Sequence, residues 1–409
     1  IQKVKKKKKN FSIENNINKK YYKNNLFLKD KVKLNKVVRN ICNNLDNKKD
    51  TFHILSKKFI LNFDKSDLTE FKKYKLIVVI GMGGSILGAN AIYSSLKEKI
   101  NKKFIFLDNL NQLKIEKIKQ KIKPKNSLFI IISKSGNTIE TLINSNLLQN
   151  KINSKNTIII TEKKNNLLNS FAKNKEILHI NHKDFIGGRY SVLSEVGMIP
   201  AYFMGLKIEN FRKNLLFFFK SKKNIMLIES VVKLSHIYNQ KKINSIIFLN
   251  YSPPLNKFLY WCQQLIAESL GKKGKGILPF ISPLPRDHHS LLQLYLDGPK
   301  DKLFYIFSLS QKNSLKINNN IFGKSFEFVE NKDLLKVIES QKKALIEVFK
   351  EKKIPFREFK IDLISEEALG ELFSYFILET ALIGKSIGID PFDQPAVEQV
   401  KILTKKYLS

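Results

Sequence analysis

Cysteine is scarce in this sequence. Only Cys42 and Cys262 occur in 409 residues, far apart and without neighbours at the spacing of metal ligands. This excludes a disulfide-stapled scaffold and a cysteine-based zinc site, and it favours two reduced thiols in a cytoplasmic protein.

Long apolar runs are also absent. The longest ones, such as residues 76–80, have the length of a strand, and the longer candidate at 371–384 carries Glu379 in its middle. No segment reaches the roughly 18 uninterrupted apolar residues that a membrane helix requires. The basic residues 1–10 lack the apolar core and cleavage site of a signal peptide. We therefore expect neither a membrane-spanning nor a secreted protein.

Acidic residues are few compared with basic ones. The chain has 36 Asp and Glu against 73 Lys and Arg, which gives a net charge of +37. Such a charge is typical of nucleic-acid binding. However, Lys, Asn and Ile are abundant throughout, as an AT-rich genome would produce, and apart from Lys5–Lys9 the lysines are spread evenly. We favour the compositional explanation, with no nucleic-acid partner, although a positive field would assist capture of a phosphorylated anion.

The length and the apolar pattern predict two domains. A chain of 409 residues exceeds what one core usually supports, and a hydrophobic content of 43% is typical of a folded protein. We predict a helical N-terminal segment over residues 1–70, domains over 71–210 and 211–388, and a helical tail over 389–409.

Short apolar runs alternate with helical patterns in both predicted domains. The expected strands are 76–80, 104–107, 128–132 and 157–160, then 245–250, 276–281, 303–309 and 356–361. The helices expected in the second half are 256–270, 333–352, 366–384 and 396–407. Continuously apolar strands indicate parallel sheets that are buried on both faces, joined by right-handed crossovers. The fold class is therefore α/β, with two doubly wound α/β/α sandwiches in tandem.

Two loops between a strand and a helix are candidates for binding phosphate. They are residues 81–85 (GMGGS) and 133–138 (SKSGNT), and ligands bind at the carboxyl ends of parallel strands. Glycines expose backbone amides, and a helix N-terminus attracts anions. Taken singly, each loop is equally well explained by turn geometry or by Asn137 or Thr138 capping a helix. Two such loops in one sheet favour a phosphorylated ligand. The lysine-rich residues 271–276 fail the nucleotide-binding pattern, and we interpret them as a solvated turn.

Six motifs in order resemble the glucose-6-phosphate isomerase family, which is built from paired flavodoxin-like sugar-isomerase domains. They are residues 81–85, 133–141 (SKSGNTIET), 187–191 (GGRYS), 264–272 (QLIAESLGK), 289–298 and 392–401 (FDQPAVEQVK). The resemblance implies an aldose–ketose isomerase that acts on a sugar phosphate through a cis-enediol. It also implies no cofactor, no metal, and a homodimer in which the histidine crosses the subunit interface.

The resemblance also implies a role for each site residue. Glu268 matches the catalytic base, and a carboxylate can remove a proton beside a carbonyl and return it to the next carbon. Arg189 matches the group that stabilises the enediolate, while His289 and Lys401 match the groups that open the sugar ring. The residues matched to substrate binding are Gly84, Ser85, Ser133, Lys134, Ser135, Thr138, Gln264 and Gln394.

Some alternatives stay open at this point. Outside the resemblance, Glu268 would be a surface residue paired with Lys272 one helical turn on. The dipeptide Pro395–Ala396 departs from the pattern of many relatives, so the loop before Lys401 is expected to differ in shape. The nearest alternative is an isomerase that also accepts mannose 6-phosphate, which the motifs do not exclude. A DNA-binding sugar-phosphate sensor is less so, because residues 1–70 offer no convincing helix-turn-helix.

Overall fold

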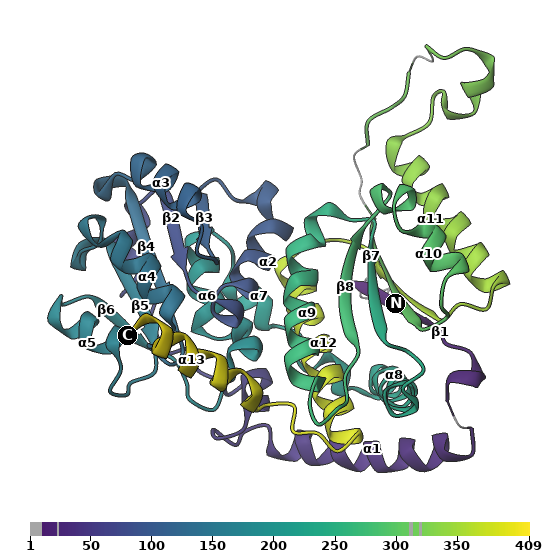
Figure 1. Cartoon of the computed structure of the whole chain (residues 1–409), viewed down its shortest axis with the longest axis horizontal. Coiled ribbons are helices and arrows are strands. Elements are labelled where there is room, and N and C mark those ends of the chain that lie inside the picture. The colour runs from purple at the N-terminus through teal and green to yellow at the C-terminus, as the bar shows by residue number, and fades with distance from the viewer. Residues whose placement is uncertain (1–9, 23, 311–313, 319–320) are drawn as a thin grey trace, which may run out of the picture.

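The computed structural model describes residues 10–22, 24–310, 314–318 and 321–409, so the run Lys5–Lys9 lies outside it. Two α/β bodies lie side by side, each built around one sheet, and helix α2 (Leu87–Ser95) of the first body packs against α9 (Asn256–Leu270) of the second (Figure 1). One continuous hydrophobic core runs through both bodies, from Ile77 to Leu382 and beyond. The domain boundaries given above therefore stay predictions.

The first sheet has the strand order β3-β2-β4-β5-β6 and is parallel throughout. Its strands are β2 (Leu76–Ile80), β3 (Lys103–Leu107), β4 (Ser127–Ile132), β5 (Thr157–Thr161) and β6 (Leu178–Asn181). All six residues of β4 are buried, as expected for a strand covered on both faces. The four predicted strands are confirmed, and their order is that of flavodoxin-like sheets.

The second sheet repeats this order with four parallel strands, β8-β7-β9-β10. They are β7 (Ser245–Asn250), β8 (Leu278–Pro283), β9 (Lys302–Leu309) and β10 (Phe356–Ile361). A fifth strand, β1 (Phe11–Asn16), pairs antiparallel with β10. This edge strand lies within the N-terminal segment that the sequence predicted to be helical. Four of the six residues in its sequence FSIENN are polar, so the sequence carries little strand pattern. In the structure, Phe11 packs against Phe218 and Tyr375.

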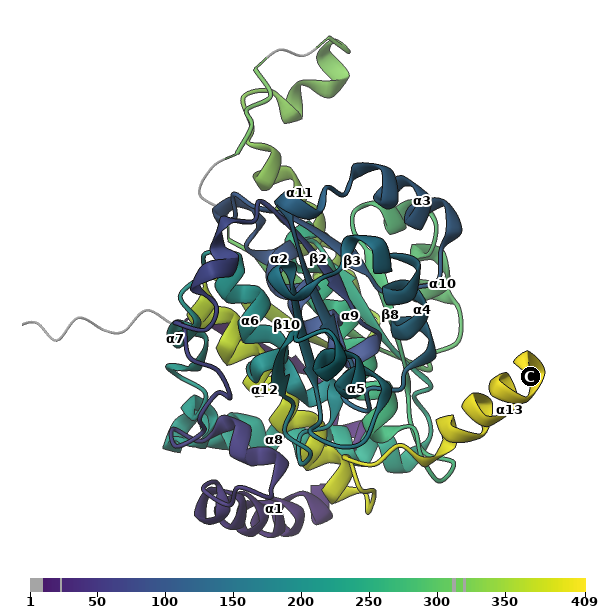
Figure 2. The same cartoon turned by 90° about the vertical axis from the view of Figure 1, so that its left-hand side faces the viewer.

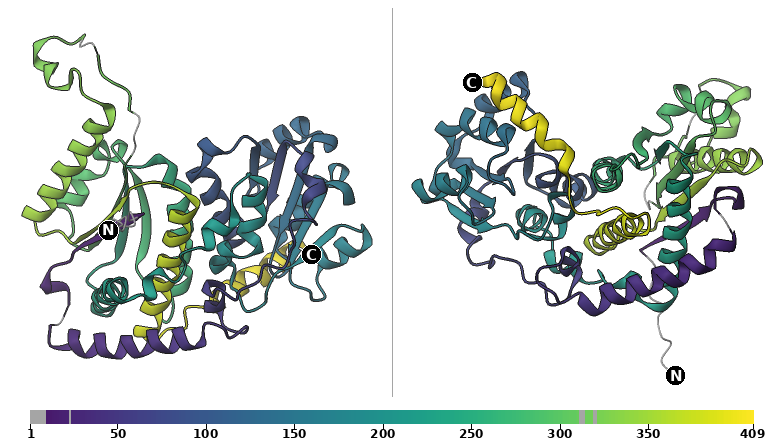
Figure 3. Two further views of the ribbon diagram at one scale, coloured as in Figure 1. Left: turned by 180° about the vertical axis from the view of Figure 1, so that it is seen from behind. Right: turned by 60° about the horizontal axis from the view of Figure 1, so that its bottom comes forward.

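Helices cover both faces of the two sheets. The remaining ones are α1 (Asn24–Asn44), α3 (Gln112–Lys121), α4 (Ile139–Leu147), α5 (Leu167–Asn174), α6 (Glu195–Phe203), α7 (Ile208–Arg212), α8 (Ser221–Gln240), α10 (Leu292–Asp297), α11 (Leu334–Glu351), α12 (Glu366–Ser386) and α13 (Glu398–Leu408). Helix α1 runs along the outside of the second body and packs on α8 (Figure 3). Among the described residues, no helix has both the length and the apolar character needed to cross a membrane.

The glutamate that interrupts the apolar segment of helix α12 is paired with an arginine in the core. Glu379 is 2% exposed and makes a two-pronged ion pair with Arg357 of β10, at 2.7 and 2.9 Å. The same guanidinium donates to Asn15 of β1 at 2.7 Å. A buried charge of this kind is tolerated only when it is paired, and here the pair ties the edge strand and α12 to the sheet.

The last helix, α13, stands off from the rest of the molecule. Figure 2 shows it projecting from the body, and every residue of α13 is exposed. The predicted tail helix is thus confirmed, but it packs on neither sheet.

Candidate active site

Two glycine-containing loops meet at the boundary of the two bodies. One is the 3₁₀ turn Gly83–Ser85 after β2, and the other is the turn Gly188–Leu193 after β6. A Cβ atom added to Gly84 would lie 2.1 Å from the carbonyl carbon of Gly188, so only glycine allows this approach. The contact places the first predicted phosphate loop next to Arg189.

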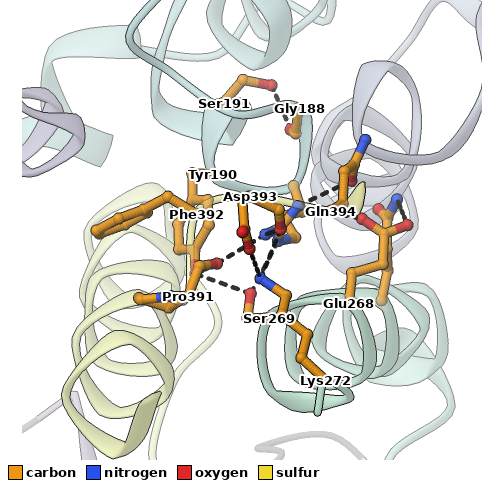
Figure 4. A network of polar contacts seen from close by, with 12 residues as sticks. Gly188, Tyr190, Ser191, Glu268, Ser269, Lys272, Pro391, Phe392, Asp393 and Gln394 are labelled. Carbon is orange, nitrogen blue, oxygen red and sulfur yellow. Dashed lines mark hydrogen bonds and ion pairs between the residues drawn. The ribbon is translucent and has the colours of Figure 1, made fainter. Parts of the chain in front are cut away.

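Arg189 is 2% exposed and is the centre of a buried hydrogen-bond network. Its partners Ser269, Pro391 and Gln394 are labelled in Figure 4. Its acceptors are Ser269 Oγ at 2.8 Å, Gln394 Oε1 at 2.9 Å, and the carbonyls of Pro391 at 2.7 Å and Asp393 at 2.8 Å. These bonds use four of the five N–H donors of a guanidinium. The remaining Nη1 donor lies 3.5 Å from Glu268 Oε2, which is too long for a strong hydrogen bond. A substrate oxygen would find one donor of a rigidly held cation available here.

Glu268 and Gln264 lie one turn apart on α9 and face the same way. Gln264 Nε2 donates to Glu268 Oε1 at 2.9 Å, and the Glu268 side chain is 34% exposed. Gln264 Oε1 is buried and has no hydrogen-bond partner among the described residues. An unpartnered buried oxygen favours a ligand at this position. The carboxylate is thus oriented on one side and open on the other, as a general base requires.

The alternative interpretation of Glu268 as a partner of Lys272 is wrong. Lys272 instead forms its ion pair with Asp393, in the segment that precedes α13. Its Nζ also donates to the carbonyls of Asp390 and Asp393, at 2.6 Å each.

The second loop, residues 133–138, lies at the carboxyl end of β4. Ser133 Oγ and Thr138 Oγ1 are 2.9 Å apart, and Ser135 is exposed. Gly136 adopts a φ of +67°, where a Cβ would lie 1.9 Å from Asn166 Oδ1. The hydroxyl groups therefore converge on a tight turn that leads directly into α4.

The helix-capping alternative for this loop is not supported. Thr138 precedes α4 but makes no capping hydrogen bond through its side chain. Asn137 Oδ1 instead accepts from the backbone N–H of Leu167. Capping therefore does not explain these side chains, and phosphate binding at the N-terminus of α4 stays a prediction.

The side chain of Lys134 points out of the loop. It donates to the Asp184 carbonyl at 2.6 Å and lies 3.6 Å from Glu162. Burial lowers the pKa of Lys134. These contacts hold the ammonium group away from the turn, and phosphate binding by the Lys134 backbone stays a prediction.

His289 and Lys401 are not brought to Arg189. Over the described ranges, neither forms a hydrogen bond or ion pair with Arg189 or Glu268. His289 is exposed at the end of the turn Arg286–His289, and Lys401 pairs with Glu398 at 3.1 Å on α13. The structure of a single chain therefore holds only part of the predicted site.

Sequence reasoning missed three residues that hold this site. Ser269 Oγ accepts from Arg189 and lies 2.8 Å from Tyr190 OH, while Lys272 fixes the segment beside them. Burial raises the pKa of Tyr190 to about 12, so its hydroxyl stays protonated and donates to the Pro391 carbonyl at 3.0 Å. The signal for all three was their position inside the motifs 187–191 and 264–272.

Taken together, these features define the class of protein to which the chain belongs. The chain is an α/β protein with two flavodoxin-like sheets, hydroxyl-lined loops at the carboxyl ends of strands, and a carboxylate opposite a fixed guanidinium. It belongs to the phosphoglucose isomerase family, since a sequence model described as Phosphoglucose isomerase matches residues 2–277. That match ends before His289, Gln394 and Lys401.

Curated relatives agree with this assignment. The chain is 33% identical to a glucose-6-phosphate isomerase of Methanocaldococcus jannaschii, over 80% of this chain and 83% of the relative. It is 32% identical to that of Campylobacter jejuni, over 88% and 91% respectively.

Solved structures agree on the fold. A hypothetical protein from Thermus thermophilus superposes with a TM-score of 0.82 at 23% identity, covering 97% of this chain and all of that one. A glucose-6-phosphate isomerase from Chlamydia trachomatis superposes at 0.70 and 19% identity, covering 84% of this chain and 71% of that one.

Proposed function

We propose that this protein interconverts glucose 6-phosphate and fructose 6-phosphate. The observation that carries the proposal is the Glu268 carboxylate beside Gln264, with Oε2 3.5 Å from Arg189 Nη1 in a long ion pair. Glu268 removes the proton from C2 of the open-chain aldose and returns it to C1, while the proton of the C2 hydroxyl passes to the C1 oxygen, so the carboxylate is regenerated. Arg189 stabilises the negative oxygen of the enediolate without giving up its proton.

The remaining predicted residues take supporting roles in this proposal. Ser85, Ser133, Ser135 and Thr138, with the backbone of Gly84 and Lys134, bind the phosphate. Gln264 and Gln394 hold the sugar between Glu268 and Arg189. His289 delivers a proton to the ring oxygen, and Lys401 assists at O1. Cys42 and Cys262 are both free thiols, in keeping with the cytoplasmic location that we propose.

A coupled isomerase assay tests this function. We expect the purified protein to form glucose 6-phosphate from fructose 6-phosphate. We also expect EDTA at about 5 mM, which removes accessible metal ions, to leave the rate unchanged. Over the described residues, no three His, Cys, Asp or Glu side chains cluster as metal ligands. Absence of turnover contradicts the proposal. A parallel assay for mannose 6-phosphate decides whether the enzyme is selective or dual.

We further propose that the enzyme is a homodimer in which His289 is supplied across the interface. Two exposed apolar surfaces support this. Val400 and Ile402 of α13 are 68% and 62% exposed. The arm, residues 314–318 and 321–333, projects above α10 and α11 in Figure 1. It carries Ile321 and Phe328, which are 84% and 71% exposed. Apolar surfaces of this kind mark protein interfaces.

Mixing two inactive variants tests this arrangement. We expect Glu268→Gln and His289→Ala to be inactive separately and active when unfolded and refolded together. In a mixed dimer, one site then combines an intact glutamate from one chain with an intact histidine from the other. Random pairing makes half of the dimers mixed with one good site each, or about a quarter of wild-type activity. Activity no greater than the sum of the separate variants contradicts supply of His289 across the interface.

A further inference from the structure

The segment that joins α12 to α13 is fixed at its start by side chains from both bodies. In this tail segment, residues 389–394, the Pro391 carbonyl accepts hydrogen bonds from both Arg189 and Tyr190. It also carries Gln394, whose side chain accepts from Arg189. The orientation of the guanidinium therefore depends on where this segment lies.

Lys272 is the third side chain that holds the tail segment. Its side chain is only 11% exposed, and its Nζ reaches the carbonyls of Asp390 and Asp393 and the Asp393 carboxylate (Figure 4). The Asp393 carbonyl accepts from Lys272 and from Arg189 at the same time, at 2.6 and 2.8 Å. Two cations that share one acceptor are stable here because the Asp393 carboxylate pairs with Lys272. The negative end of the α9 dipole also lies close by.

The lysine-rich turn is thus not simply solvated. It begins where α9 ends, and Gly276 closes it with a φ of +130° and a Cβ position 2.9 Å from Gly271 Cα. This tight closure aims two lysines at the chain after α12. Lys272 holds the tail segment, while Lys275 donates to the Ile387 carbonyl at 2.6 Å, outside that segment.

We propose that Lys272 is a positioning residue for catalysis, a conclusion that rests on the proposed isomerase function. By fixing the Asp390 and Asp393 carbonyls, it keeps the acceptors of Arg189 in place and Gln394 beside the guanidinium. Without it the tail segment moves away from α9, and Arg189 loses the Pro391, Asp393 and Gln394 acceptors together. The second Nη1 donor, 3.5 Å from Glu268 Oε2 in the native protein, then no longer faces the carboxylate.

The expected signature is a loss of kcat with little change in KM. Lys272 contacts neither Glu268 nor the hydroxyl-lined loop, so in Lys272→Met the phosphate contacts persist and only the one substrate contact through Gln394 is weakened. Misplacement of a catalytic group by about 1 Å costs roughly 10²-fold, and we expect kcat to fall by about 30- to 100-fold with KM within about threefold. Lys272→Arg, which retains a cation of similar reach, should recover most of the rate.

Lys275→Met is the matched control because it removes a lysine–carbonyl bond from the same turn. We expect it to lower the melting temperature by a similar amount but to leave kcat unchanged. Equal kcat in Lys272→Met and Lys275→Met overturns the proposal. So does full additivity when Lys272→Met is combined with Arg189→Lys, since a residue that acts through Arg189 loses its effect once Arg189 is altered.

Hydrogen exchange tests, independently of turnover, whether Lys272 holds the tail segment in place. The backbone amides of residues 389, 390 and 392–394 should exchange faster in Lys272→Met, and in Lys272→Gln if the first variant does not fold, but not in Lys275→Met. Unchanged exchange in Lys272→Met overturns the proposal that Lys272 holds the tail segment. A wild-type protein without isomerase activity contradicts the proposed function instead, whatever the exchange result.

Discussion

Replacing Glu268 with glutamine lowers kcat by about 10³- to 10⁴-fold, because the amide cannot accept the proton that isomerisation removes. The substitution keeps the shape of the side chain. Its carbonyl oxygen can still accept from Gln264 Nε2, which donates to Glu268 Oε1 at 2.9 Å in the native protein. Only the distant charge contact with Arg189, at 3.5 Å, is lost. Binding of fructose 6-phosphate should therefore survive.

Three measurements check this prediction. Steady-state kinetics gives kcat, titration calorimetry with fructose 6-phosphate gives a Kd expected within about fivefold of wild type, and NMR in D₂O follows exchange of the carbon-bound proton. Glu351→Gln, at the exposed end of α11, is the control and should behave as wild type. Normal turnover in Glu268→Gln would show that another group is the base. Loss of binding together with turnover would show that the carboxylate only holds the fold of the site.

The sheets were predictable because their strands are continuously apolar. Runs such as residues 76–80 and 128–132 are buried on both faces, and burial leaves a strong pattern in the sequence. Strands β6 (LHIN) and β1 (FSIENN) lie at sheet edges with partly exposed residues, so their sequences carry little of that pattern. The β8 strand was placed two residues early, since Gly276 and Ile277 belong to the preceding turn.

The candidate site was predictable where residue identity decides the chemistry. Glu268 and Arg189 are close in space although 79 residues apart, and their motifs alone pointed to this pairing. The role of Lys272 was hidden, because its partner Asp393 lies 121 residues away and helical spacing suggested Glu268 instead. His289 and Lys401 stay predictions, since their place depends on groups that one chain does not bring together.

Arg189→Lys should lower kcat by about 10²- to 10³-fold, the size of effect that follows loss of a preorganised donor at a developing oxyanion. The reason is geometric. Four N–H groups of Arg189 point at Ser269, Pro391, Asp393 and Gln394, and the planar fork thereby aims the fifth toward Glu268. An ammonium group has three donors on a single atom and cannot reach acceptors that are spread around a guanidinium.

The loss should appear in kcat more than in substrate affinity. The enediolate carries a negative charge that the ground-state sugar lacks, so a misplaced cation weakens binding of the transition state selectively. Kinetics of fructose 6-phosphate turnover, together with calorimetric Kd, separates the two effects.

Arg212→Lys is the control that isolates this effect from general loss of arginine hydrogen bonds. Arg212 also donates to buried carbonyls, those of Leu193 and Ile54 at 2.7 and 2.9 Å, but it makes no contact with Glu268 or the tail segment. Burial lowers the pKa of Arg212 to about 10, which leaves it charged at neutral pH.

Each arginine substitution leaves buried acceptors unpaired, at about 1–3 kcal/mol of folding free energy per group, so both variants should melt at a lower temperature. Only Arg189→Lys should lose kcat. Equal kcat losses in the two variants, or a kcat of Arg189→Lys close to wild type, would mean that the guanidinium stabilises the boundary between the two bodies and not the enediolate.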